Sequence, residues 1–110
     1  MSYSILTIPP FDRQVKRLLK KYPSLKNDLI YFAETLQENP IQGTDLGKNC
    51  YKIRFAITSK GKGKSGGARI ITNLIITQET IYLISIYDKG EKETLTDKEL
   101  KELLKNIPDL

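Results

Sequence analysis

Two β-branched runs in the second half of the chain most constrain its fold. Residues 69–77 read RIITNLIIT and residues 80–87 read TIYLISIY, with only Gln78 and Glu79 between them. β-branched and aromatic residues favour extended strands, and so short a connection joins antiparallel neighbours. The sequence therefore predicts a β-hairpin around which the rest of the chain packs.

A further strand is predicted just before this hairpin. In residues 51–57 (YKIRFAI) apolar side chains alternate with basic or small ones. Because successive side chains of a strand point to opposite faces, we expect Lys52 and Arg54 on one face and the apolar residues on the other. The β-prone residues 3–8 predict another short strand, closed by Pro9 and Pro10.

Helical patterns fill the remaining segments. Asp12 is a predicted N-cap followed by apolar residues at helical spacing, and Ser24 is predicted to cap a second helix that ends at Asn39 and Pro40. Residues 96–99 (TDKE) match a capping box, which predicts a short last helix with an apolar face between Leu100 and Ile107.

The predicted order is β-α-α-β-β-β-α. We expect one α+β domain over residues 1–110, in which a meander of antiparallel strands carries an N-terminal helical hairpin on one face. A chain of 110 residues is long enough for one modest core. No apolar run is long enough to span a membrane and no signal peptide is predicted, so we expect a cytoplasmic protein.

The composition narrows the possible chemistry. The chain has no histidine and one cysteine, Cys50, which we expect to be a small buried residue. The absence of histidine removes the usual zinc ligands and the commonest general base. We therefore predict no metal site and no cofactor.

The excess positive charge is concentrated in one segment. The whole chain carries a formal charge of +5, yet residues 46–78 contain no acidic residue. A patch of one sign on an otherwise balanced protein is typical of a site for a polyanion. The basic residues of this segment are Lys48, Lys52, Arg54, Lys60, Lys62, Lys64 and Arg69.

A glycine-lysine loop, SKGKGKSGGAR over residues 59–69, lies within this segment. Its GKS triplet is similar to the end of a Walker motif, but the glycine required five positions earlier is Thr58, and a strand rather than a helix follows. A solvated connection is the simplest alternative. If the flanking strands pair, however, Lys52, Arg54 and Arg69 meet in one basin, and clustered like charges favour an anion there.

Tyr87 ends the last predicted strand and is a candidate for proton transfer. Nearby cations would favour its phenolate and lower its pKa. The alternative is an ordinary strand-end tyrosine with its hydroxyl in water. Asp88 and Lys89 follow, and we expect them to pair at the surface.

Three stretches together carry a resemblance to a known family. The KIR of residues 52–54, the SKGKGKSGGARII of residues 59–71 and the YLISIYDK of residues 82–89 resemble toxins of the RelE/HigB group of bacterial type II toxin–antitoxin modules. The similarity is strongest over residues 39–105. It implies an endoribonuclease that enters the ribosomal A site and cuts mRNA without a metal, by attack of the ribose 2′-hydroxyl on the adjacent phosphate.

The resemblance also implies roles for individual residues. Arg54 and Arg69 are expected at the phosphate and Lys52 or Tyr87 at proton transfer. Lys89, at the basic position just beyond the last strand, is a further catalytic candidate. Contacts to RNA outside the chemical step are expected from Lys48, Lys60, Lys62 and Lys64. Some relatives place histidines or a later tyrosine at the catalytic end, and this chain has neither, so the identity of the base stays open.

Partners and alternatives follow from the same resemblance. Such toxins act on the ribosome and mRNA and are held inactive by a cognate antitoxin, through which alone they reach operator DNA. The apolar face between Leu100 and Ile107 is a candidate antitoxin acceptor, or else it covers the end of the sheet. A gyrase inhibitor of the ParE type, which shares the fold, and a non-catalytic nucleic-acid-binding module remain alternatives.

Overall fold

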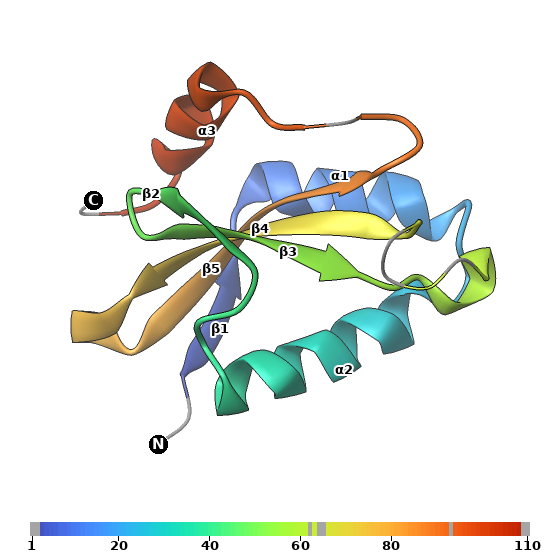
Figure 1. Cartoon of the computed structure of the whole chain (residues 1–110), viewed down its shortest axis with the longest axis horizontal. Coiled ribbons are helices and arrows are strands. Elements are labelled where there is room, and N and C mark those ends of the chain that lie inside the picture. The colour runs from blue at the N-terminus through green and yellow to red at the C-terminus, as the bar shows by residue number, and fades with distance from the viewer. Residues whose placement is uncertain (1–2, 62, 64–65, 93, 109–110) are drawn as a thin grey trace.

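A mixed five-stranded sheet with helices on both sides forms the protein (Figure 1). The computed structural model describes residues 3–61, 63, 66–92 and 94–108. In chain order the elements are β1 (Ser4–Thr7), α1 (Pro9–Leu19), α2 (Leu25–Glu38), β2 (Thr44–Gly47), β3 (Cys50–Phe55), the 3-10 turn η1 (Thr58–Lys60), β4 (Ala68–Ile75), the 3-10 turn η2 (Ile76–Gln78), β5 (Thr80–Asp88) and α3 (Asp97–Leu104). The predicted α+β class is confirmed.

The predicted hairpin is the centre of the sheet, whose order is β1-β5-β4-β3-β2. β4 pairs with β5 and with β3, both in the antiparallel sense. The sheet is not a pure meander, however, because β1 pairs with β5 in parallel. A strand from the N-terminus thus closes one edge, which sequence order alone did not indicate.

Strand β2 was not predicted. Its sequence, TDLG, contains residues that are depleted in strands, and it forms because it pairs with β3. Lys48 and Asn49 connect the two strands, both at positive φ (54° and 61°). Two central residues at positive φ are what a tight two-residue hairpin requires.

The start of α1 differs from the prediction. The helix begins at Pro9, and Ile8 occupies the N-cap position, so Asp12 lies in the first turn instead of capping it. Proline is well suited to the first helical position because its missing N–H has no partner there. Pro9 and Pro10 therefore open this helix as well as ending β1.

The second helix follows its predicted limits. Ser24 stands at the N-cap of α2 and Asn39 at its C-cap, but the Ser24 side chain makes no cap hydrogen bond. Its Oγ instead contacts Asp28 and Ser59. The Phe32 ring packs edge-on against Phe55 of β3, with 5.4 Å between ring centroids. α2 therefore covers the β3 face that carries the predicted apolar side chains.

The capping box of α3 is confirmed. The Glu99 backbone N–H donates to Thr96 Oγ1 at 3.1 Å, and the Thr96 N–H donates to Glu99 Oε1 at 3.0 Å. Leu100, Leu104 and Ile107 are buried in the core. The apolar face that was a candidate antitoxin acceptor is therefore taken up by the protein's own sheet, on the side opposite α2 (Figure 1).

Within the described ranges, no helix combines the length and the apolar character that crossing a bilayer requires.

The capping box generates a stability prediction. Thr96→Ala removes the side chain that accepts from the Glu99 N–H, and we expect the free energy of unfolding to fall by about 1 kcal/mol. Urea denaturation measures this change. Thr94→Ala, at an exposed position outside the helix, is the matched control and should change stability by less than half as much. Equal effects of the two variants would contradict the capping role.

Candidate active site

A row of functional side chains crosses three strands on one face of the sheet. Arg54 of β3 lies directly opposite Arg69 of β4, and Arg69 lies directly opposite Tyr87 of β5. Opposed residues of an antiparallel pair project to the same face, with Cβ atoms about 5 Å apart. Lys52, two positions before Arg54, shares this face. Four of the five predicted catalytic residues thus lie on one face of the sheet.

A glycine allows β3 and β4 to approach where this row begins. A Cβ added to Gly67 would lie 2.2 Å from the Phe55 carbonyl oxygen. Such a distance is far inside van der Waals contact, so a larger residue would push the strand ends apart. Gly67 therefore keeps β3 and β4 close just before the point where Arg54 and Arg69 lie opposite each other.

The two arginines differ in their surroundings. Arg54 is exposed, whereas Arg69 is only 8% exposed and donates from Nη1 to the Ala68 carbonyl oxygen at 3.0 Å. Like charges placed directly opposite across a strand pair are destabilising. An anion between the two guanidinium groups would offset that repulsion, and guanidinium groups bind phosphate well.

The burial of Tyr87 and the direction of its pKa shift differ from the prediction. It is 5% exposed, and its hydroxyl is buried with no hydrogen-bond partner among the described residues. Burial raises its pKa, Arg69 opposes that effect, and Glu99 adds to it. The expected lowering of the pKa is wrong because loss of hydration outweighs the neighbouring cation. Tyr87 is thus a protonated phenol at neutral pH.

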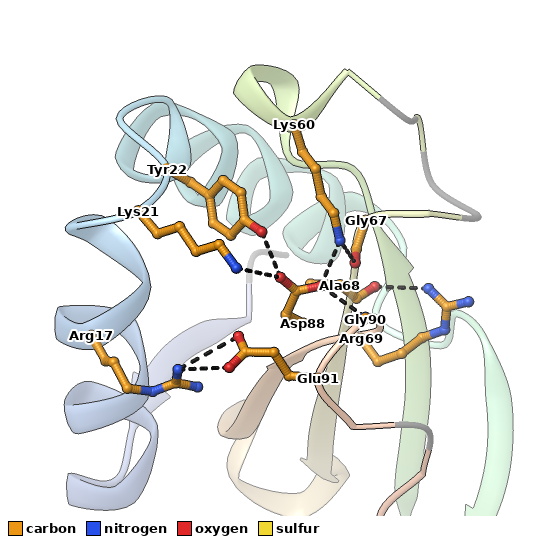
Figure 2. Close-up of polar contacts among 10 residues, drawn as sticks. All are labelled: Arg17, Lys21, Tyr22, Lys60, Gly67, Ala68, Arg69, Asp88, Gly90 and Glu91. Carbon is orange, nitrogen blue, oxygen red and sulfur yellow. Dashed lines mark hydrogen bonds and ion pairs between the residues drawn. The ribbon is translucent and has the colours of Figure 1, made fainter.

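Lys60 of the glycine-lysine loop is placed away from this row. Its ammonium bonds a carboxylate oxygen of Asp88, which is 2% exposed, and the Gly67 carbonyl oxygen at 3.3 Å. Figure 2 shows Lys60 and Tyr22 converging on Asp88 while Arg69 points away from it. The expected contact of Lys60 with RNA is therefore replaced by an internal ion pair.

Asp88 is the centre of a buried polar cluster, so its expected surface pairing with Lys89 is wrong. Its carboxylate accepts from Lys60, from the Tyr22 hydroxyl and from the Gly90 N–H, and Lys21 lies 3.8 Å away. Burial alone would raise the pKa of Asp88, but these donors lower it to about 2. The cluster joins the α1–α2 turn, the loop and the end of β5.

A second cluster holds the start of the loop. Asp28 of α2 accepts from the Thr58 N–H at 2.9 Å and from the Thr58 hydroxyl at 2.6 Å. Ser24 Oγ accepts from the Ser59 N–H at 2.8 Å. The loop is therefore anchored to α2 before it reaches its glycines.

The catalytic candidate Lys89 and the remaining predicted RNA contacts lie in different parts of the protein. Lys89 is exposed and follows β5 at the sheet end that carries Arg54 and Arg69, with its N–H donating to Gly67. Lys48 lies in the β2–β3 turn, at the other end of β3 from Arg54. Lys62 and Lys64 lie outside the described residues.

The structure also places residues near Tyr87 that the sequence analysis did not assign to the site. A pocket of about 540 Å³ is lined by Tyr87 and Ser85 of β5, Arg13 and Gln14 of α1, and Glu99 and Leu103 of α3. These residues come from three distant segments, and only Glu99 carried a local signal, its capping box. In the described part of the chain, no group of three or more His, Cys, Asp or Glu side chains could hold a metal ion.

Comparisons with known proteins agree with this architecture. The family model described as RelE toxin of the RelE/RelB toxin–antitoxin system matches residues 11–108. A free E. coli RelE toxin variant is 20% identical with a TM-score of 0.59, and the match covers 97% of this chain and 99% of that one. The toxin of the intact E. coli RelBE complex is 17% identical with a TM-score of 0.60, over 79% and 96% of the two chains.

The fold and the site define the class: a small α+β protein with a row of basic side chains across one face of its sheet. The match over residues 11–108 covers α2, all of α1 except Pro9 and Pro10, and the segments that carried the resemblance. The chain belongs to the RelE family of toxins of toxin–antitoxin systems.

The Asp88 cluster predicts a pH dependence of stability. Because the pKa of Asp88 falls from its ordinary 3.8 to about 2 on folding, its carboxylate contributes stability above pH 4, and this contribution is lost as the pH falls toward 2. We expect the loss to be about 2 kcal/mol. Urea denaturation between pH 6 and pH 2 measures it.

Asp88→Asn is the comparison variant for this experiment. Glu99, whose pKa is also lowered to about 2, is present in both proteins, so its contribution cancels in the difference. The stability gap between the wild type and Asp88→Asn should narrow as the pH falls from 4 to 2. A gap that stays constant over this range would contradict the role given to Asp88.

Proposed function

We propose that this toxin is a ribosome-dependent mRNA endoribonuclease that cuts translated mRNA in the A site without a metal ion. One observation carries the proposal: Arg54, Arg69 and Tyr87 lie opposite one another across three strands, with Lys52 on the same face. The two arginines can stabilise negative charge, and Tyr87 and Lys52 can transfer protons. These are the groups required when the 2′-hydroxyl of an RNA attacks its neighbouring phosphate. The RelE family supports the same activity.

The reaction needs charge stabilisation and two proton transfers. The ribose 2′-oxygen forms a bond to phosphorus as the bond from phosphorus to the 5′-oxygen breaks, which leaves a cyclic phosphate and a 5′-hydroxyl. Arg54 and Arg69 hold the phosphate and stabilise the negative charge that builds on its oxygens. The 2′-proton must be taken up and the 5′-oxygen must be protonated.

The structure favours one division of the proton transfers. The raised pKa of Tyr87 keeps its phenol protonated at neutral pH, which suits it to donate to the departing 5′-oxygen. Lys52 is then the proposed acceptor of the 2′-proton. The sequence left these two roles open, and the burial of Tyr87 supports this proposed division.

The remaining contacts concern RNA and protein partners. Lys89 lies at the same end of the sheet as the arginine row and is proposed to contact mRNA or ribosomal RNA, as are Lys48, Lys62 and Lys64. One related E. coli toxin structure is a complex with an antitoxin RelBc peptide. We propose that a cognate antitoxin likewise restrains this toxin, that it alone connects the toxin to operator DNA, and that both act in the cytoplasm.

Charge removal tests the proposed site. We expect Lys52→Ala, Arg54→Ala and Arg69→Ala each to slow mRNA cleavage on programmed ribosomes by about 100-fold or more, the scale of losing one charge-stabilising group. Lys26→Ala, at an exposed position on α2, should cleave at the wild-type rate. Primer extension on the mRNA measures the cleavage rates.

Folding must be separated from chemistry in this test. Arg54 is exposed, so Arg54→Ala should retain the wild-type unfolding midpoint, whereas the buried Arg69 requires that control explicitly. Wild-type cleavage rates in all three variants would show that the row of cations is not the site.

A further inference from the structure

The β3–β4 ladder ends next to its two arginines. Its last pair is Phe55 with Ala68, and the pair before it is Arg54 with Arg69. Like charges directly opposite each other across two strands are destabilising, and the ends of an element are the parts that open most easily. Repulsion between the two arginines therefore acts where the ladder is weakest, so another interaction must hold this end closed.

Lys60 bridges the two strands at this end. It lies in η1, which follows β3, and its ammonium donates to the carbonyl oxygen of Gly67, the residue before β4, at 3.3 Å. The same ammonium is paired with the Asp88 carboxylate at the end of β5 (Figure 2). Because Asp88 lies directly opposite Ala68, one side chain fastens the connection between β3 and β4 to the end of β5.

The position of Lys60 is itself fixed from α2. Thr58 donates to the Asp28 carboxylate from its N–H and from its hydroxyl, and the Ser59 N–H donates to Ser24 Oγ. The Lys60 side chain is only 14% exposed. Its ammonium therefore acts from a supported position, which precise positioning of a site requires, and not as a freely moving surface cation.

Stability alone gives a weak reason for this arrangement. A buried ion pair loses hydration on folding, and apolar side chains of similar volume often stabilise a protein as well or better. The Asp88 carboxylate nevertheless accepts from Lys60, from the Tyr22 hydroxyl and from the Gly90 N–H. A fully bonded polar cluster fixes one arrangement of the segments that it joins. Here these segments are the α1–α2 turn, η1 and the neighbouring ends of β4 and β5.

We propose that Lys60 and Asp88 are positioning residues of the phosphate site, whose ion pair holds Arg54 and Arg69 opposite each other before RNA binds. Neither Lys60 nor Asp88 touches the RNA, and both act through the spacing of the two arginines. Charges that are already in place need no reorganisation when the reaction begins. The inference rests on the proposed function and adds to it residues that set the rate of cleavage without contacting the reacting atoms.

Amide hydrogen exchange of the purified toxin tests whether the ion pair holds the end of the ladder. Lys60→Met keeps the length of the side chain and removes its charge. We expect exchange at residues 67–70, relative to residues 72–75 of the same strand, to become about tenfold faster or more, because a charged hydrogen bond that closes this end is lost. Lys60→Arg keeps the charge and the donors and should exchange as the wild type does.

Ile81→Val is the matched control for a general loss of stability. Ile81 is buried in β5, at the end of the strand away from Asp88. Deleting one methyl group from the core destabilises the fold modestly. The relative exchange at residues 67–70 and the rate of mRNA cleavage should both stay at the wild-type value, at a temperature where the variant remains folded.

Cleavage kinetics on programmed ribosomes test whether Lys60 acts through the arginines. Lys60→Met should lower kcat by about tenfold or more with little change in KM, because misplaced charges weaken the transition state and not ribosome binding. In an Arg54→Ala background the same substitution should slow cleavage by less than about twofold, since no arginine pair is left to position. Lys60→Arg should recover most of the lost kcat.

The possible outcomes separate this inference from the proposed function. If Lys60→Met speeds exchange at residues 67–70 but cleaves as the wild type does, the ion pair is only structural, and the inference fails while the proposed function stands. Effects of Lys60→Met and Arg54→Ala that multiply would mean that Lys60 contacts RNA itself, which also overturns the inference. Unchanged exchange in Lys60→Met overturns it whatever the cleavage rate. A wild-type toxin that leaves mRNA intact on ribosomes contradicts the proposed function instead.

Discussion

The register of β3, β4 and β5 is the constraint on which the site depends. It places two guanidinium groups directly opposite each other and a phenol opposite the second. A shift of one residue in either pairing would move one member of this row to the other face. Strand pairing, which the buried residues of the hairpin enforce, therefore also determines how the side chains of the proposed site are arranged.

The basic segment serves two purposes that the sequence could not separate. Arg54 and Arg69 lie opposite each other on β3 and β4, whereas Lys60 is held by Asp88 at the end of β5. The Asp88 cluster anchors the loop next to the strand ends that carry the arginines. Part of the excess positive charge is therefore structural, because Lys60 is used in an internal ion pair.

Much of the fold followed from local patterns. The β4–β5 hairpin, the alternation of Lys52 and Arg54 against buried neighbours and the capping box of α3 were all predicted, because each depends on residues close in sequence. β2 was missed because its TDLG sequence has little strand preference of its own. The parallel pairing of β1 was missed because it joins the two halves of the chain.

The site was less predictable than the fold, for a physical reason. The direction of the Tyr87 pKa shift was wrong because burial by α1 and α3 outweighs the effect of Arg69. The partners of Asp88 come from residues that lie 28 and 66 positions away. Charge and periodicity identify which residues to consider, but solvation and long-range pairing decide what each one does.

Mapping of mRNA 5′ ends after brief induction of the toxin tests whether it cuts translated mRNA in the cell. We expect new 5′ ends that bear hydroxyl groups, lie only within translated reading frames, and are absent when Arg54→Ala is induced instead. Arrested growth with intact mRNA and an induced DNA-damage response would contradict it and would indicate inhibition of gyrase.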